Sequence, residues 1–109
     1  MTTVRPGDFY VADIPFTNGM ASKKRPVFVL WLEGDDAVVA SVTTAAPRSV
    51  TDVLIHAWSA AGLRKPSAVR LSRLDCLEQS LLIARLGAVS EDDASRLKIA
   101  WRDHIRLQF

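Results

Sequence analysis

An arginine and a threonine stand where the sequence could support phosphate chemistry. Arg25 comes directly before Pro26, which restricts Arg25 to extended geometry, so its guanidinium is expected at the end of a rigid apolar strand. Thr43 is expected to end the neighbouring strand, close enough for its hydroxyl to share a ligand with Arg25. A guanidinium can hold a phosphate through two parallel hydrogen bonds. The two residues predict a phosphate site, although their spacing is also compatible with a strand-end arginine whose head group is solvated.

The distribution of charge along the chain is more informative than its sum. The chain has 14 Lys and Arg residues and 12 Asp and Glu residues, which give a formal net charge of +2. Basic residues gather in two segments, 23–25 and 64–73, whereas residues 31–60 are mainly acidic. Two basic segments can converge on one polyanion site, and they are equally compatible with scattered, solvated surface charges.

Other common kinds of catalytic site have no support in the sequence. The single cysteine, Cys76, follows Asp75 and has no basic neighbour that would activate its thiol. His56 and His104 are far apart, so there is no zinc-like cluster, and both are expected to have structural roles, on a strand face and near a helix end. The patterns of P-loop proteins, serine hydrolases and zinc proteases are absent. We therefore expect neither a metal nor a cofactor.

Length and composition set the class of protein. A chain of 109 residues predicts a single domain, 1–109. Hydrophobic residues make up 49% of the chain and charged residues 24%, which is typical of a globular protein. No apolar run approaches the 18 or so residues of a membrane span, and no secretory signal is visible at the start. These features predict a soluble protein of the cytoplasm without membrane association.

The elements that must position these residues are mostly strands. Apolar runs bounded by Gly, Pro and Asp predict five strands, over residues 8–14, 26–32, 37–43, 53–58 and 67–71. The composition of residues 16–24 predicts an exposed loop, and residues 74–89 are expected to form a turn followed by a strand.

One helix is expected at the end of the chain, from Ser90 to about Leu107. Ser90 and Asp93 form a capping-box pattern. Apolar residues at helical spacing then mark one face, Ala94, Leu97, Trp101 and Ile105. Five or six short strands with this helix predict a mainly β (α+β) fold, a small and partly closed barrel.

The order of these segments resembles the MazF/PemK/Kid family of bacterial type II toxins, and its PemK-like branch in particular. Residues 7–17 look like the opening strand of the family and its Pro-Phe-Thr loop entry. Residues 24–30 are similar to its Arg-Pro motif, and 40–44 to its Pro-Ile-Thr-Ser segment. Residues 62–71 and 85–90 are close to the PemK-like branch. The resemblance implies the small SH3-like β-barrel of MazF and CcdB, with a C-terminal helix.

The resemblance also implies a function. Family members are metal-independent, sequence-specific endoribonucleases that cut single-stranded RNA, commonly mRNA, and leave 2′,3′-cyclic phosphate and 5′-hydroxyl ends. By motif position, the catalytic residues of the family fall on Arg25 and Thr43. The implied partners are RNA, a second copy in a homodimer, and a cognate antitoxin with an acidic tail, through which alone DNA would be contacted.

Further residues are expected to bind the RNA substrate. The loop over residues 16–24 lines the RNA groove in the family. The expected substrate-binding residues are Asn18, Ser22, Lys24, Thr44, Arg70, Ser72 and Arg73. Ser72 stands where some relatives carry an acidic residue, so the general base is unassigned, and Ser41 replaces a family proline.

Two alternatives from other functional classes stay open. One is a relative that binds RNA without cutting it. The other is a protein-targeting poison of the CcdB kind, which acts on gyrase. CcdB toxins end in Trp-Gly-Ile, whereas this sequence ends in Leu107-Gln108-Phe109, which argues against the gyrase target.

Overall fold

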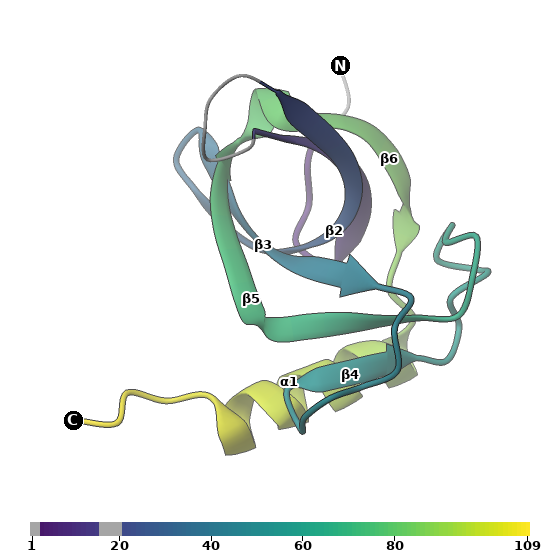
Figure 1. The fold of residues 1–109 in the computed structure, drawn as a ribbon, viewed down its shortest axis with the longest axis vertical. Coiled ribbons are helices and arrows are strands. Elements are labelled where there is room, and N and C mark those ends of the chain that lie inside the picture. The colour runs from purple at the N-terminus through teal and green to yellow at the C-terminus, as the bar shows by residue number, and fades with distance from the viewer. Residues whose placement is uncertain (1–2, 16–20) are drawn as a thin grey trace.

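The computed structural model describes residues 3–15 and 21–109, and these form six strands and one α-helix. The sheet runs in the order β4-β5-β3-β2-β1-β6, with every pairing antiparallel. Figure 1 shows the strands curling round a common interior, with the helix against β4. The elements are β1 (Asp8–Pro15), β2 (Ser22–Glu33), β3 (Asp36–Thr43), β4 (Asp52–Ile55), β5 (Ser67–Glu78), the 3-10 turn η1 (Gln79–Leu81), β6 (Leu82–Ala88) and α1 (Glu91–His104).

The mainly β fold with a C-terminal helix is therefore confirmed. Within the described residues, the edge strands β4 and β6 do not pair with each other, so the barrel is only partly closed. No helix in the described part of the chain is long and apolar enough to cross a membrane.

Two apolar clusters lie on opposite faces of the curled sheet. Successive side chains of a strand point to opposite faces, so Val27 and Val29 of β2 lie in the interior cluster, whereas Phe28 lies in the cluster beneath α1. In β3, Val39 joins the interior cluster and Ala40 the cluster beneath α1. The predicted apolar run over 26–32 is explained by this arrangement, because a strand buried on both faces needs no polar alternation.

The strand β5 bends sharply between its two halves, as its corner in Figure 1 shows. Leu74 pairs with Ala40 of β3, and the next residue of β3, Ser41, pairs with Arg70. Residues 71–73 are therefore an insertion in β5 that has no counterpart in β3. Such a bulge bends a strand and changes which of its residues share a face.

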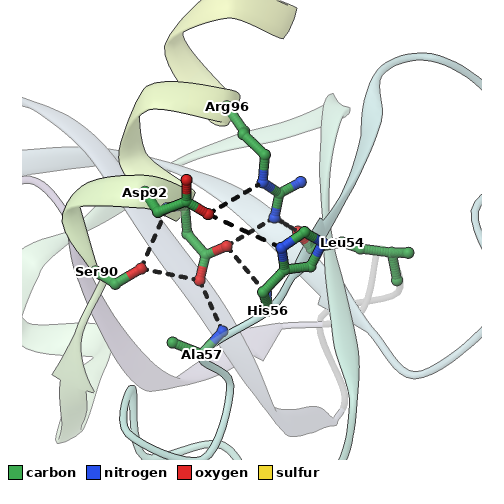
Figure 2. A network of polar contacts seen from close by, with 7 residues as sticks. Leu54, His56, Ala57, Ser90, Asp92 and Arg96 are labelled. Carbon is green, nitrogen blue, oxygen red and sulfur yellow. Dashed lines mark hydrogen bonds and ion pairs between the residues drawn. The ribbon is translucent and has the colours of Figure 1, made fainter.

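The helix α1 is fastened to the barrel through a buried carboxylate. Asp93 is 0% exposed, and it accepts hydrogen bonds from the backbone N–H of His56 and of Ala57, both at 2.9 Å. Ser90 caps the helix: its Oγ accepts the N–H of Asp93 and donates to Oδ2 of Asp93, both at 3.1 Å. Arg96 contacts Oδ1 of Asp93 at 2.6 Å and also donates to the Leu54 carbonyl (Figure 2).

These donors favour the charged form of the carboxylate. Burial by itself raises the pKa of Asp93, but the backbone N–H groups of Ala57 and His56, with Arg96 and Ser90, outweigh that effect and lower this pKa to about 2. The predicted capping residues are confirmed. The Asp93 side chain, however, reaches across to the chain after β4 rather than only back to its own helix end.

Several predicted boundaries were wrong. Residues 22–24 belong to β2 and not to a loop, because they pair with the end of β1: Lys24 lies opposite Asp13. Residues 16–20 of that predicted loop lie outside the described residues. The strand β4 ends at Ile55, where the chain turns toward α1, so His56 is not on a strand face. Residues 74–78 continue β5, which leaves only 79–81 as the predicted turn before β6. The helix α1 ends at His104, three residues before the expected Leu107.

Candidate active-site cleft

A polar cleft of about 390 Å³ opens at the mouth of the barrel interior. Five basic side chains and one carboxylate line it, together with polar and apolar groups from β1, β2 and β3. The lining residues are Ile14, Lys23, Arg25, Pro26, Ser41, Val42, Thr43, Arg48, Arg70, Arg73 and Asp75. Basic residues of both sequence segments, 23–25 and 64–73, therefore meet at one place.

Strand alternation explains why Arg25 and Thr43 point into this cleft. Arg25 lies two residues before Val27 in β2, on the face that carries the interior cluster. Thr43 lies two residues after Ser41 in β3, and Ser41 is the pairing partner of Val27. The two side chains thus extend the same apolar face to the mouth of the barrel, where it becomes polar. Arg25 lies within β2 and not before it, so its backbone is fixed by pairing with Ala12.

The bend in β5 brings Arg70 and Arg73 to the same cleft. In a regular strand, residues three apart point to opposite faces. Because residues 71–73 are inserted relative to β3, Arg70 lines the cleft from one half of β5, and Arg73 and Asp75 line it from the other. Leu71 meanwhile packs beneath α1.

Arg70 is held from beneath by a buried carboxylate. Its Nε lies 3.4 Å from Oδ1 of Asp52, its pairing partner in β4, and the Asp52 side chain is 2% exposed. The other oxygen of Asp52 accepts the backbone N–H of Arg48 at 3.0 Å. Arg48 lies in the connection between β3 and β4 and is exposed at the cleft.

The structure gathers four of the nine residues predicted from sequence: Arg25, Thr43, Arg70 and Arg73. Four others are exposed and do not line the cleft: Ser22, Lys24, Thr44 and Ser72. Lys24 alternates with the lining residues Lys23 and Arg25, and Thr44 follows Thr43 beyond the end of β3. Ser72 lies in the bend, where a two-residue spacing from Arg70 no longer means a shared face. Asn18 lies outside the described residues.

Sequence reasoning missed Lys23, Arg48 and Asp75 as residues of the site. Two of them could have been predicted from sequence. Lys23 is two residues from Arg25 and Asp75 is two residues from Arg73, and residues two apart in a strand lie on the same face. Arg48 carried none, since it lies outside any strand and its place depends on the fold.

A second group of candidate ligands lies at the helix joint. His56, Asp92 and Asp93 bring ligand atoms within 4.8 Å of one another. Asp93 already accepts bonds from two backbone N–H groups and Arg96, and Nε of Arg96 lies 3.8 Å from Asp92. A cation there would have to displace the guanidinium from both carboxylates, so this donor set fits an ion-pair network better than a metal site.

The family model that matches this chain and the solved structures that resemble it describe the same kind of protein. A family model described as PemK-like, MazF-like toxin of type II toxin-antitoxin system matches residues 5–104. A search of curated proteins finds no match. The Mycobacterium tuberculosis toxin MazF-mt6 is similar in fold, with 22% identity, a TM-score of 0.69 and coverage of 85% of this chain and 90% of that chain.

Two further solved structures share the fold. An endoribonuclease in complex with its cognate antitoxin, from a mycobacterial species, has 17% identity and a TM-score of 0.70 and covers 90% of each chain. MazF from Deinococcus radiodurans has 15% identity and a TM-score of 0.66, with coverage of 92% of this chain and 93% of that chain.

Proposed function

The chain belongs to the PemK-like, MazF-like toxins of type II toxin-antitoxin systems, and on that basis we propose that it is an endoribonuclease whose active site is the basic cleft. The observation that carries the proposal is the convergence of Arg25 and Thr43, from adjacent strands, on one polar cleft. The names of solved relatives, which include a mycobacterial endoribonuclease, support the activity.

The proposed reaction uses the substrate's own nucleophile. The 2′-hydroxyl oxygen of a ribose attacks the adjacent phosphorus while the bond from phosphorus to the 5′ oxygen breaks. The products are a 2′,3′-cyclic phosphate and a 5′-hydroxyl. Such a transesterification needs donors that stabilise the growing negative charge on the phosphate, and Arg25 and Thr43 supply a guanidinium and a hydroxyl there. No cofactor enters this reaction.

Arg25 itself is a poor candidate for the general base, because arginine stays protonated in proteins. Asp75 is the one carboxylate among the described residues that line the cleft. We assign it to take the proton of the 2′-hydroxyl, in place of the acid that Ser72 replaces. The leaving 5′ oxygen takes its proton from solvent.

The substrate we propose is single-stranded RNA, mRNA in particular, cut at a preferred sequence. The basic side chains of the cleft are mostly exposed around a hollow at the end of a barrel, which suits an unpaired backbone with splayed bases. Lys23, Arg48, Arg70 and Arg73 would bind phosphates along that backbone.

The proposed partners follow from the family. Antitoxins accompany two of the solved relatives, a mycobacterial endoribonuclease and MazF of Deinococcus radiodurans. We propose that this toxin is likewise neutralised by a cognate antitoxin, whose acidic tail would suit the basic cleft, and that DNA is contacted only through the antitoxin. We further propose a homodimer that acts in the cytoplasm, where mRNA lies.

A cleavage assay tests the activity. The purified protein, with EDTA present, should cut a long single-stranded RNA and leave 2′,3′-cyclic phosphate ends. Arg25→Ala should lower the rate by about 10²–10³, the usual cost of losing one donor to a transition-state oxyanion. Arg102→Ala is the matched control, because Arg102 is an exposed arginine of α1 that does not line the cleft.

The outcomes separate the competing functions. Equal rates for wild type and Arg25→Ala would refute the site. Tight RNA binding without any product would identify an RNA-binding relative that does not cut. Inhibition of DNA supercoiling without RNA cleavage would identify a gyrase poison.

A further inference from the structure

The carboxylate of Asp52 is buried beside the cleft without lining it. Its side chain is 2% exposed, and it lies in β4, the edge strand next to β5. Burying a carboxylate is unfavourable unless a partner compensates its charge, so the contacts of Asp52 should show which groups it stabilises.

Asp52 contacts both segments that bring arginines to this side of the cleft. Its Oδ1 lies 3.4 Å from Nε of Arg70, on β5. Its Oδ2 accepts the backbone N–H of Arg48 at 3.0 Å, and its own N–H donates to the carbonyl of Ser49 at 3.1 Å. One carboxylate thus ties the connection that carries Arg48 to the strand that carries Arg70.

Comparison with another buried carboxylate–arginine pair, Asp8 with Arg85, shows how the contact between Asp52 and Arg70 differs. Arg85 donates to both oxygens of Asp8, at 3.0 and 3.3 Å, so that pair satisfies its own hydrogen bonds. Oδ1 of Asp52 and Nε of Arg70 are buried with no hydrogen-bond partner in the described structure, although they are close enough to attract each other. Among the described residues, no hydrogen bond or ion pair involves the terminal nitrogens of Arg70, and Arg70 lines the cleft, where these nitrogens can bind a ligand.

We propose that Asp52 is a positioning residue, which holds Arg70 and the backbone at Arg48 so that both guanidiniums bind one RNA phosphate. This phosphate neighbours the one bound by Arg25 and Thr43. The inference rests on the proposed function, because it takes RNA as the ligand of the cleft. Arg70 is only 19% exposed, so its side chain is already ordered before a ligand arrives.

The expected effect follows from the cost of ordering a side chain. Without the carboxylate, Arg70 must be immobilised by the RNA, and this costs affinity on binding. Asp52→Asn keeps the size of the side chain and an oxygen for the N–H of Arg48, and removes the charge that holds Arg70. We expect the Kd for RNA to rise by up to about tenfold, which corresponds to about 1.4 kcal/mol. KM for cleavage should rise similarly, with a smaller change in kcat.

The test measures binding and cleavage separately. Binding is followed by fluorescence anisotropy of a short, mixed-sequence RNA with 2′-O-methyl groups, which cannot be cut. Asp8→Asn is the matched control, because it breaks a buried carboxylate–arginine pair that lies away from the cleft. Asp52→Asn should weaken binding and Asp8→Asn should not. Arg70→Ala should weaken binding, and the double variant Arg48→Ala with Arg70→Ala should reduce the slope of log Kd against log salt by about 0.7, the value for one phosphate contact on a single strand.

The double variant Asp52→Asn with Arg70→Ala should bind no more weakly than Arg70→Ala alone, since Asp52 acts through Arg70. Additive losses, or equal affinities for Asp52→Asn and Asp8→Asn, would overturn the proposal. If Asp52→Asn does not fold, the double variant Arg48→Ala with Arg70→Ala replaces it. Losses of RNA affinity that add fully in this double variant would show that the two arginines do not share a phosphate, and would overturn the proposal. A protein that binds the 2′-O-methyl RNA but cuts no RNA would refute the proposed activity and leave this inference standing. If the wild type cuts RNA but Asp52→Asn binds RNA as tightly as Asp8→Asn does, the proposed activity stands and this inference is refuted.

Discussion

Replacing Asp93 by asparagine tests how α1 is fastened to the barrel. The substitution keeps the volume of the side chain and removes its charge. In the native protein this carboxylate is fully buried and accepts hydrogen bonds from the backbone after β4, from the helix cap and from Arg96. An amide has one oxygen in place of two, so at least one of the donors loses its acceptor.

The magnitude can be worked from the pKa of Asp93, which falls from its ordinary value of 3.8 to about 2 in the folded protein. Each unit corresponds to about 1.36 kcal/mol, so the charged form contributes between about 2 and 3 kcal/mol to stability. Because the folded-state value is the lower one, this contribution is complete above pH 3.8 and is lost as the pH falls toward 2. We expect Asp93→Asn to lower the free energy of unfolding by about 3 kcal/mol at neutral pH.

The assay is equilibrium unfolding in urea, followed by tryptophan fluorescence at a series of pH values. Trp58 and Trp101 pack against the cluster beneath α1, so they report on the joint. Asp92→Asn is the control, because it removes the neighbouring carboxylate, which is 76% exposed and lies 3.8 Å from Arg96. Exposed pairs contribute between about 0 and 1 kcal/mol, and the control should lose no more than that.

Two results would refute the reasoning. Equal losses of unfolding free energy in Asp93→Asn and Asp92→Asn would show that the buried carboxylate contributes no more to stability than the exposed one. An unchanged loss of stability between pH 4 and pH 2 in Asp93→Asn would show that another group causes the acid sensitivity.

The remaining predictions concern the cleft. Lys23→Ala should weaken RNA binding and reduce the slope of log Kd against log salt by about 0.7. Lys24→Ala removes the same charge from the other face of β2, so it should change the affinity and the slope much less. Equal effects of the two variants in salt titrations would mean that only the net charge of the protein matters. Asp75→Asn should lower kcat, because an amide cannot take the proton of the 2′-hydroxyl. A kcat equal to that of the wild type would exclude Asp75 as the base.

Much of the fold could be predicted because local patterns agreed with it. The apolar run over 26–32 marks a strand buried on both faces, and Ser90 with Asp93 marks the start of α1. The errors arose where tertiary pairing overrides composition. Lys23 and Lys24 have the composition of a loop, yet they extend β2 because β1 supplies partners for their backbone.

The candidate site was predictable where strand alternation holds and not elsewhere. Arg25 and Thr43 point the same way because both strands are regular between the core and the cleft. Arg70 and Arg73 were predicted as site residues. They line the same cleft because β5 bends between them, and no local sequence pattern predicts that bend. The position of Arg48 depends on a buried carboxylate four residues later, Asp52, whose partner Arg70 is far away in the sequence.

The bend in β5 also affects how the sequences of relatives can be compared. A gap-free alignment assumes that matched residues in two strands face the same way, and the insertion at residues 71–73 breaks that assumption on its far side. A relative whose strand lacks this three-residue insertion would present a different set of side chains to its cleft while keeping the same apparent motif. An acid aligned with Ser72 in such a relative can therefore correspond in space to Asp75 of this chain. Equivalence across this strand should be assigned from superposed structures, where the position of the corner is visible, and only then transferred to sequences.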